Sequence, residues 1–234
     1  ALLPITAMLL GVGLHRTYAG AGTVLAVCSI VVAAVFGAWM LTFWMEGEIS
    51  LEDVHGGYYC PISASGLVGA LAAGQSGLRL LALGCFTVGV LFYIVISVFL
   101  LLRLALRPRL PAPLVPTLAI MMAPPAFAAG AWLTISGGRP DPLFDSLTGL
   151  AVFMALVQLA LLPQYLALPF TVGFWSFTFP LESVALLAMI WLGIERPFAW
   201  QEATVALVGA LTLVIGVIAA RSLLELSRSV AQPA

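Results

Sequence analysis

The chain has 234 residues, of which 62% are hydrophobic and 8% charged, with a net charge of -1 and no lysine. A soluble domain has about 45–50% apolar and about 25% charged residues, so this composition excludes a soluble globule. The chain also lacks the basic patch that nucleic-acid binding requires, and we expect no nucleic-acid partner. The composition instead predicts an all-α protein that crosses a lipid bilayer several times.

A membrane-spanning helix needs about 20 mostly apolar residues, and this template fits the chain repeatedly. Short polar stretches separate the apolar segments, and the longest of these stretches is 46–59. We find no soluble domain and no linker, so residues 1–234 are expected to form one membrane-embedded unit. The predicted segments are 1–14, 20–45, 60–75, 78–102, 114–135, 143–167, 170–193 and 202–224.

The first residues enter apolar sequence directly, without a methionine, a charged region or the cleavage site of a signal peptide. We therefore expect a fragment that starts inside a membrane helix.

The arginines divide five to four between the two sides of the membrane, and three of the five cluster in 102–113. By the positive-inside rule this cluster predicts a cytoplasmic location for that loop and for the C-terminus.

The residue types that carry metal or catalytic chemistry lack the required spacing. Cys28, Cys60 and Cys85 form no CxxC pair, and His15 and His55 form no HExxH motif. The sequence around Ser65 suggests a serine nucleophile, but no histidine lies within a predicted span to activate it. We therefore expect no metal, no cofactor and no enzymatic activity.

Prolines divide the predicted segments into two groups. A proline in a membrane helix removes a backbone hydrogen bond, which is tolerated where the helix meets other protein or a water-filled path. The pattern indicates an inner ring of bent helices inside an outer ring of straight ones, although membrane helices in general carry more proline than soluble ones. The odd-numbered segments contain Pro4, Pro61, Pro124, Pro125 and Pro180, whereas in the even-numbered segments a proline stands only near the end of the sixth, Pro163.

Within the seventh segment, the stretch 174–183 (FWSFTFPLES) contains both Pro180 and Glu182. A carboxylate at bilayer depth costs about 2.5–3.5 kcal/mol, so a helix that served only as an anchor would avoid it. In an α-helix, residues three and four apart share a face, which here combines aromatic rings, hydroxyls and the acid. An aromatic ring on this face could close a pore as a hydrophobic gate, or could simply pack between helices.

Three interpretations of Glu182 remain open. It could be a protonatable site for proton-coupled transport, because ionisable residues inside the membrane often serve function. It could be kept neutral by desolvation and donate a hydrogen bond between helices. It could also lie nearer the interface and be hydrated.

The bent segments supply further candidates to line a path. No arginine lies in the middle of a span, so attraction of an anion would come from helix N-termini, backbone amides and hydroxyls. The predicted pore-lining residues are Pro4, Thr6, Pro61, Ser65, Pro124, Pro125, Trp175, Ser176, Phe177, Pro180, Glu182 and Ser183.

Three stretches resemble a known family: 1–9 (ALLPITAML), 118–126 (LAIMMAPPA) and 173–179 (GFWSFTF). In sequence, order and spacing they are similar to the tellurite-resistance/dicarboxylate transporter family. That family includes bacterial tellurite-resistance channels, fungal malate permeases and plant guard-cell slow anion channels. The resemblance covers essentially the whole chain, and its most specific part is 173–179.

The resemblance implies a trimeric membrane protein with ten helices per subunit, in which five bent inner helices surround a pore. The match begins at the family's third helix, so the chain corresponds to the last eight of ten. It also implies a gate at Phe179 rather than Phe177. The expected cargo is a small anion, such as chloride, nitrate, sulfite, a C4-dicarboxylate or a tellurite-related anion, and the expected location is the cell membrane, here a bacterial inner membrane.

The chain departs from the bacterial channel pattern at two positions, where Pro180 replaces a glycine and Glu182 replaces a small residue. An ionised carboxylate one turn from the gate would repel anions. A proton-coupled dicarboxylate or organic-anion permease or exporter that uses Glu182 is therefore the alternative to a passive channel. A membrane subunit with a structural role and no transport is a more remote alternative.

Overall fold

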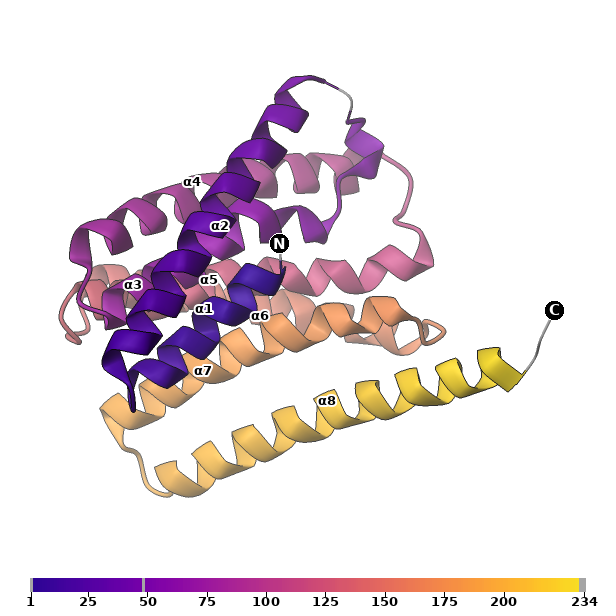
Figure 1. Cartoon of the computed structure of the whole chain (residues 1–234). Coiled ribbons are helices and arrows are strands. Elements are labelled where there is room, and N and C mark those ends of the chain that lie inside the picture. Colours follow the sequence, from indigo (N-terminus) through magenta and orange to yellow (C-terminus); the bar gives the residue numbers. More distant parts are fainter. Residues whose placement is uncertain (1, 48, 232–234) are drawn as a thin grey trace.

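The computed structural model describes residues 2–47 and 49–231, and within this part of the chain all regular structure is helical (Figure 1). Each of the eight predicted apolar segments corresponds to a helical segment, which confirms an all-α polytopic membrane protein. Four segments are uninterrupted α-helices without a proline near their middle. These are α2 (Ala19–Met45), α4 (Arg79–Leu106), α6 (Pro142–Leu166) and α8 (Trp200–Ala231).

The odd-numbered segments are shorter or change helix type along their length. The first is α1 (Leu2–His15); the third combines η2 (Gly56–Tyr59), η3 (Cys60–Ala64) and α3 (Ser65–Gln75). The fifth combines η4 (Ala112–Met122) with α5 (Ala123–Ile135), and the seventh combines η5 (Val172–Phe177) with α7 (Thr178–Glu195). Here η3 is a π-helical turn, whereas η2, η4 and η5 are 3₁₀-helical, as is η1 (Leu51–Asp53) in the preceding loop.

The number of helical segments long enough to span a bilayer is smaller than the eight segments predicted from the sequence. Among the described residues, 6 helical segments are long and apolar enough to span a bilayer. The first segment, α1, has only 14 residues, and the α-helical part of the third, α3, has only 11. The third segment also begins at Gly56, four residues before the predicted start, because the 3₁₀ turn η2 leads into it.

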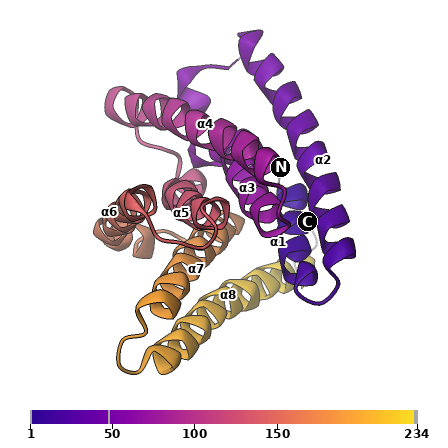
Figure 2. The ribbon, with the colours of Figure 1, turned by 90° about the vertical axis from the view of Figure 1, so that its left-hand side faces the viewer.

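The described helices form an inner and an outer group. Figure 2 shows α3 and α5 in the middle, with α2, α4, α6 and α8 towards the periphery. The core packs residues of α1 and α3, such as Met8 and Leu67, against Phe127 of α5. Alanine and glycine make up most of α3, which lets neighbouring helices approach closely. The odd-numbered segment α7 is less covered than α3 and α5, since only one side of it packs on the bundle.

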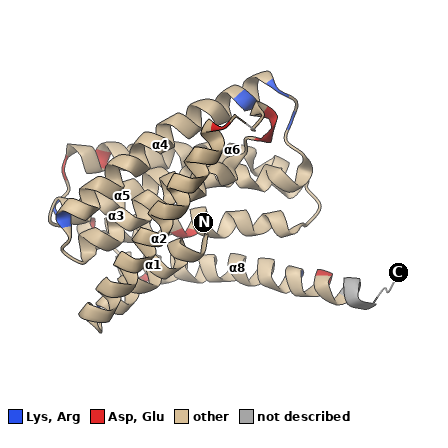
Figure 3. Ribbon diagram, turned by 45° about the horizontal axis from the view of Figure 1, so that its top comes forward, with Lys and Arg blue, Asp and Glu red and all other residues tan. Residues whose placement is uncertain are grey.

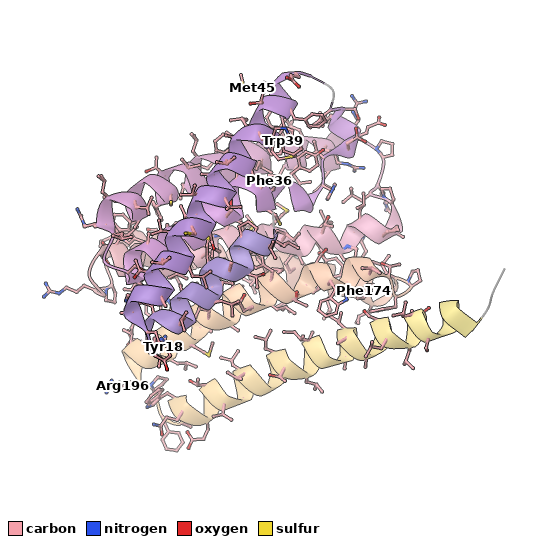
Figure 4. All side chains as sticks on the ribbon, viewed as in Figure 1. Tyr18, Phe36, Trp39, Met45, Phe174 and Arg196 are labelled. Atoms are coloured by element: carbon pink, nitrogen blue, oxygen red, sulfur yellow. The ribbon has the colours of Figure 1, made fainter. Side chains whose placement is uncertain are left out.

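Consecutive segments alternate in direction, so the odd-numbered segments all run the same way. Figure 4 places Tyr18 and Arg196 at one end of the bundle and Met45 and Phe174 at the other. The 3₁₀ and π-helical parts of three inner segments therefore gather at the end that holds Met45 and Phe174. We refer to this end as the irregular end.

The prolines of these segments stand close to the change of helix type. Pro124 and Pro125 lie in the first turn of α5, and Pro180 is the third residue of α7. The first N–H groups of a helix have no acceptor within it, so a proline there removes no intrahelical hydrogen bond. Pro180 thus lies in the first turn of the α-helical part of its segment, just after the change from the 3₁₀-helix η5 to the α-helix α7.

At the irregular end, η2 and η4 are in direct contact. The N–H of Gly56 donates a hydrogen bond to Oγ1 of Thr117 over 3.2 Å, and this hydroxyl donates to the carbonyl of Leu114. Next to this contact, Nδ1 of His55 accepts a hydrogen bond from the N–H of Gly57. Burial lowers the pKa of His55, which favours the neutral ring that this acceptor role requires.

At the opposite end, Asp141 joins an inner helix to an outer one. Its carboxylate caps α6 by accepting hydrogen bonds from the N–H groups of Leu143 and Phe144, and it also accepts one from the indole of Trp132 on α5 at 2.9 Å. The hydrogen bond from Phe144, followed by that from Trp132, lowers the pKa of Asp141. This contact holds the connection between α5 and α6 in place.

Charged side chains are concentrated towards the ends of the helices (Figure 3). At the irregular end, Arg107 forms an ion pair with Glu52 at 3.6 Å. The distribution agrees with a bundle whose middle lies in hydrocarbon, where an unpaired charge is costly.

Candidate functional site

The predicted gate residue lies against another aromatic ring in the centre of the bundle. Phe179 is the second residue of α7, and its ring stacks on Phe127 of α5 with the centroids 5.0 Å apart and the planes 24° apart. Phe127 is 1% exposed and belongs to the core that α1, α3 and α5 share. The side chain of Phe179 therefore reaches from α7 to the other inner segments.

Phe177 faces a different part of the molecule, although only two residues separate it from Phe179. Its ring meets that of Tyr165 on α6 edge to face, with the centroids 4.9 Å apart. It packs in a second cluster with Leu118 of η4 and Leu161 of α6. Of the two phenylalanines, Phe179 is thus the one next to the main core.

Trp175 connects the seventh segment to α8. Its indole N–H donates a hydrogen bond to Oγ of Ser222 over 2.9 Å. Close by, the guanidinium of Arg221 lies over the ring of Phe170, 5.8 Å from its centroid. The two contacts fasten the C-terminal part of α8 to the start of the segment that carries Phe179.

The acid and the hydroxyls near Phe179 differ in their surroundings. Ser183 is buried, and its hydroxyl donates a hydrogen bond to the carbonyl of Pro180 at 2.7 Å. Ser176 and Glu182 are half-buried, and the described residues offer the carboxylate of Glu182 neither a hydrogen-bond donor nor an ion-pair partner. Glu182 thus lies one turn from Phe179 as a carboxylate that its neighbours leave unpaired.

The remaining sequence candidates lie on α1, on the third segment and on α5. Pro4 is buried in α1, and the hydroxyl of Thr6 bonds the carbonyl of Leu2. Pro61 and Ser65 line a groove between α2 and α4 on the outer side of the bundle. Pro124 and Pro125 are buried at the start of α5, three and two residues before Phe127.

Phe127 is the residue at this site that the sequence reasoning missed. It directly follows the stretch 118–126 that carries part of the family resemblance, and it lies on the same segment as Pro124 and Pro125. Its position next to the paired prolines was the available signal.

Among residues 2–47 and 49–231, no three histidine, cysteine, aspartate or glutamate side chains come together as metal ligands would.

A model of the voltage-dependent anion channel family, SLAC1, matches residues 1–223 of the chain. The chain belongs to this family. The match extends from α1 into α8, so it includes Phe127, Phe179 and Glu182.

Several family members are similar to the chain in sequence. The tellurite resistance protein TehA homolog of Haemophilus influenzae is 28% identical over 189 residues, which cover 79% of this chain and 56% of that protein. The S-type anion channel SLAH2 of Arabidopsis thaliana is 27% identical over 185 residues, which cover 77% of this chain and 34% of that channel. The guard cell S-type anion channel SLAC1 of the same plant is 31% identical over 119 residues, covering 51% of this chain and 21% of that channel.

The chain spans about half the length of the TehA homolog and a smaller share of the two plant channels. Membership of the SLAC1 family and a multi-pass membrane location follow from the family match and the helices. The family is one of anion channels and not of enzymes, in agreement with the class expected from the sequence.

Proposed function

We propose that this SLAC1-family protein moves small anions across the membrane along a path between its inner segments, and that Phe179 closes the path. Support comes from the family match and from the relatives named as anion channels. The observation that carries the assignment of the gate is the stacking of Phe179 on Phe127 in the middle of the inner segments. A ring at this position can exclude water and ions from a narrow apolar path.

The direction of the inner segments supplies a reason for anion selectivity. The third, fifth and seventh segments begin at the irregular end, so the positive ends of their dipoles point to the same mouth. The N–H groups at the start of a helix also attract anions. This arrangement favours anions without a charged side chain in the middle of the pore.

The substrate class that we propose is a small inorganic or organic anion, such as chloride, nitrate, sulfite, a C4-dicarboxylate or a tellurite-related anion. We further propose that residues 1–234 act as one membrane unit in a homotrimer of the cell membrane, with the irregular end and the C-terminus in the cytoplasm. The arginines of 102–113 support this orientation through the positive-inside rule.

The direct test is a flux measurement on the full-length protein in liposomes, with chloride, nitrate, sulfite and malate compared at two pH values. We expect flux of at least one of these anions above that of protein-free liposomes, and no flux of potassium. Absence of anion flux from correctly inserted protein would contradict the proposal and would favour the structural subunit.

Proton-coupled transport is the second candidate function, and the unpaired, half-buried carboxylate of Glu182 favours it. A protonated Glu182 would let an anion pass the ring of Phe179, whereas an ionised one would repel it. If protons are coupled in this way, flux rises as the pH falls, and Glu182→Gln, which fixes the neutral form, removes the dependence on pH.

The control for this prediction is Glu195→Gln, at the far end of the same helix, which should leave the pH profile of the flux unchanged. A profile that Glu182→Gln does not alter excludes the coupling role. The passive channel would then be retained, because the anion panel tests it separately.

A further inference from the structure

A groove of about 720 Å³ lies on the outer side of the bundle between α2 and α4. The space exists because several residues on its two walls have small side chains, among them Ala34 and Ala38 on α2 and Gly84 on α4. Its floor consists of inner-segment residues: Pro61 and Ile62 of η3, Ser65 and Gly66 of α3, and Met8 of α1. The groove is separate from the Phe179–Phe127 stack.

The lining of the groove suits an apolar occupant. Its side chains are hydrocarbon except for the hydroxyl of Ser65, the thiol of Cys85 and the thioether of Met8. The hydroxyl of Ser65 already donates a hydrogen bond to the carbonyl of Pro61 at 2.7 Å. A polar molecule or an ion would lose its hydration there without gaining new hydrogen bonds, which costs free energy.

Along α4, the groove is about as long as one leaflet of a bilayer is thick. Along α4 the lining runs from Leu80 to Phe92, which is about 18 Å at a rise of about 1.5 Å per residue. Half of a hydrocarbon core about 30 Å thick is about 15 Å. Because Leu80 is the second residue of α4, this wall of the groove extends from the membrane interface to roughly the middle of the bilayer, whereas on α2 the lining runs from Ile30 to Leu41, towards Met45.

A positive charge stands at the interfacial end of the groove. Arg79 is the first residue of α4 and adjoins Leu80, and its side chain is exposed. It makes no hydrogen bond or ion pair with the side chains of residues 2–47 and 49–231. The N-terminus of α4 adds a positive partial charge at the same place, so this end complements the phosphate of a lipid.

We propose that the groove binds one acyl chain of an anionic phospholipid whose phosphate contacts Arg79. The lipid belongs to the leaflet at the end opposite the irregular end. Its acyl chain lies against Met8, which shares a core with Phe127, so the lipid fills space directly behind the inner segments. This site does not depend on the proposed transport function.

The chain offers a way to fill the groove without disturbing helix packing. A Cβ atom placed on Gly84 would meet no other atom within 4 Å, so Gly84→Trp can extend into the groove. Gly149 on α6 is equally free of neighbours and exposed, but it lies outside the groove. Gly149→Trp is therefore a matched control, and Ala34→Leu, on the opposite wall, is a second filling variant if Gly84→Trp folds poorly.

The experiment is native mass spectrometry of the full-length protein taken from membranes of phosphatidylglycerol and phosphatidylcholine. We expect the native protein and Gly149→Trp to retain phosphatidylglycerol, and Gly84→Trp or Ala34→Leu to retain at least tenfold less. Arg79→Gln should abolish the preference for phosphatidylglycerol, whereas Arg139→Gln, at the same end in the loop before α6, should not.

Lipid retention by the filled variants equal to that of the native protein would overturn the proposal. A change in the oligomeric state of Gly84→Trp, with lipid retention unchanged, would also overturn it and would show that a second copy of the chain covers this face. Equal retention of both lipids by the native protein would refute the contact between Arg79 and a phosphate.

Discussion

Replacing Phe179 with alanine is expected to raise anion flux by about tenfold or more, which corresponds to a barrier lower by about 1.4 kcal/mol. The substitution removes the ring that lies on Phe127 at the centre of the inner segments. Removing a large apolar side chain from a hydrophobic constriction widens it and lets water enter, so the cost of dehydrating an anion falls. Chloride or nitrate efflux from liposomes measures the change.

Phe177→Ala is the matched control for this prediction. It removes an identical side chain from the same segment, but its ring contacts Tyr165 in the cluster beside α6. We expect flux close to that of the native protein. Equal increases in the two variants would indicate a general loosening of the seventh segment, and unchanged flux in Phe179→Ala would refute the gate.

The stack also gives Phe127 a testable role as a positioning residue. Phe127→Ala leaves the ring of Phe179 without its partner, so we expect an intermediate rise in flux. In the double variant, flux should match that of Phe179→Ala alone, because Phe127 acts only through the ring it supports. Such non-additivity is typical of residues in direct contact.

The broad fold could be predicted because each apolar segment is marked in the sequence by its length and by the position of its prolines. Pro61, the pair Pro124 and Pro125, and Pro180 identify the irregular segments. The sequence did not indicate the helix type, because a 3₁₀ or a π-helical turn depends on which carbonyl each N–H meets after packing. The early start of the third segment at Gly56 was missed for the same reason.

The candidate site was predicted in part. The change of helix type explains why Trp175 faces another direction than the sequence predicts. An α-helical projection places Trp175 and Phe179 on one face, but Trp175 belongs to the 3₁₀ turn η5, in which residues three apart align. Trp175 accordingly faces Ser222 of α8. The partners Phe127, Tyr165 and Ser222 come from other segments, so a single sequence does not reveal them.

Replacing Gly56 with alanine is expected to prevent normal folding of the irregular end. A Cβ atom at Gly56 would lie 1.8 Å from the carbonyl oxygen of Thr117, and backbone atoms on both sides limit any adjustment. Overpacking a core usually costs about 1–3 kcal/mol, and this overlap involves backbone rather than a flexible side chain. We therefore expect the free energy of unfolding to fall by more than about 3 kcal/mol, which lowers the ratio of folded to unfolded protein by a factor of more than about 100.

The measurement is the thermal stability and the monodisperse fraction of the protein in detergent, with Gly149→Ala as the control because a Cβ there meets no neighbour within 4 Å. Thr117→Val provides a second comparison. It keeps the shape but removes the hydroxyl that accepts the hydrogen bond from Gly56 at 3.2 Å, so it should cost only about 1–3 kcal/mol. Equal stability of Gly56→Ala and Gly149→Ala would show that η2 and η4 do not make this close contact in the folded protein. The mouth formed by the irregular ends of the inner segments would then need a different arrangement.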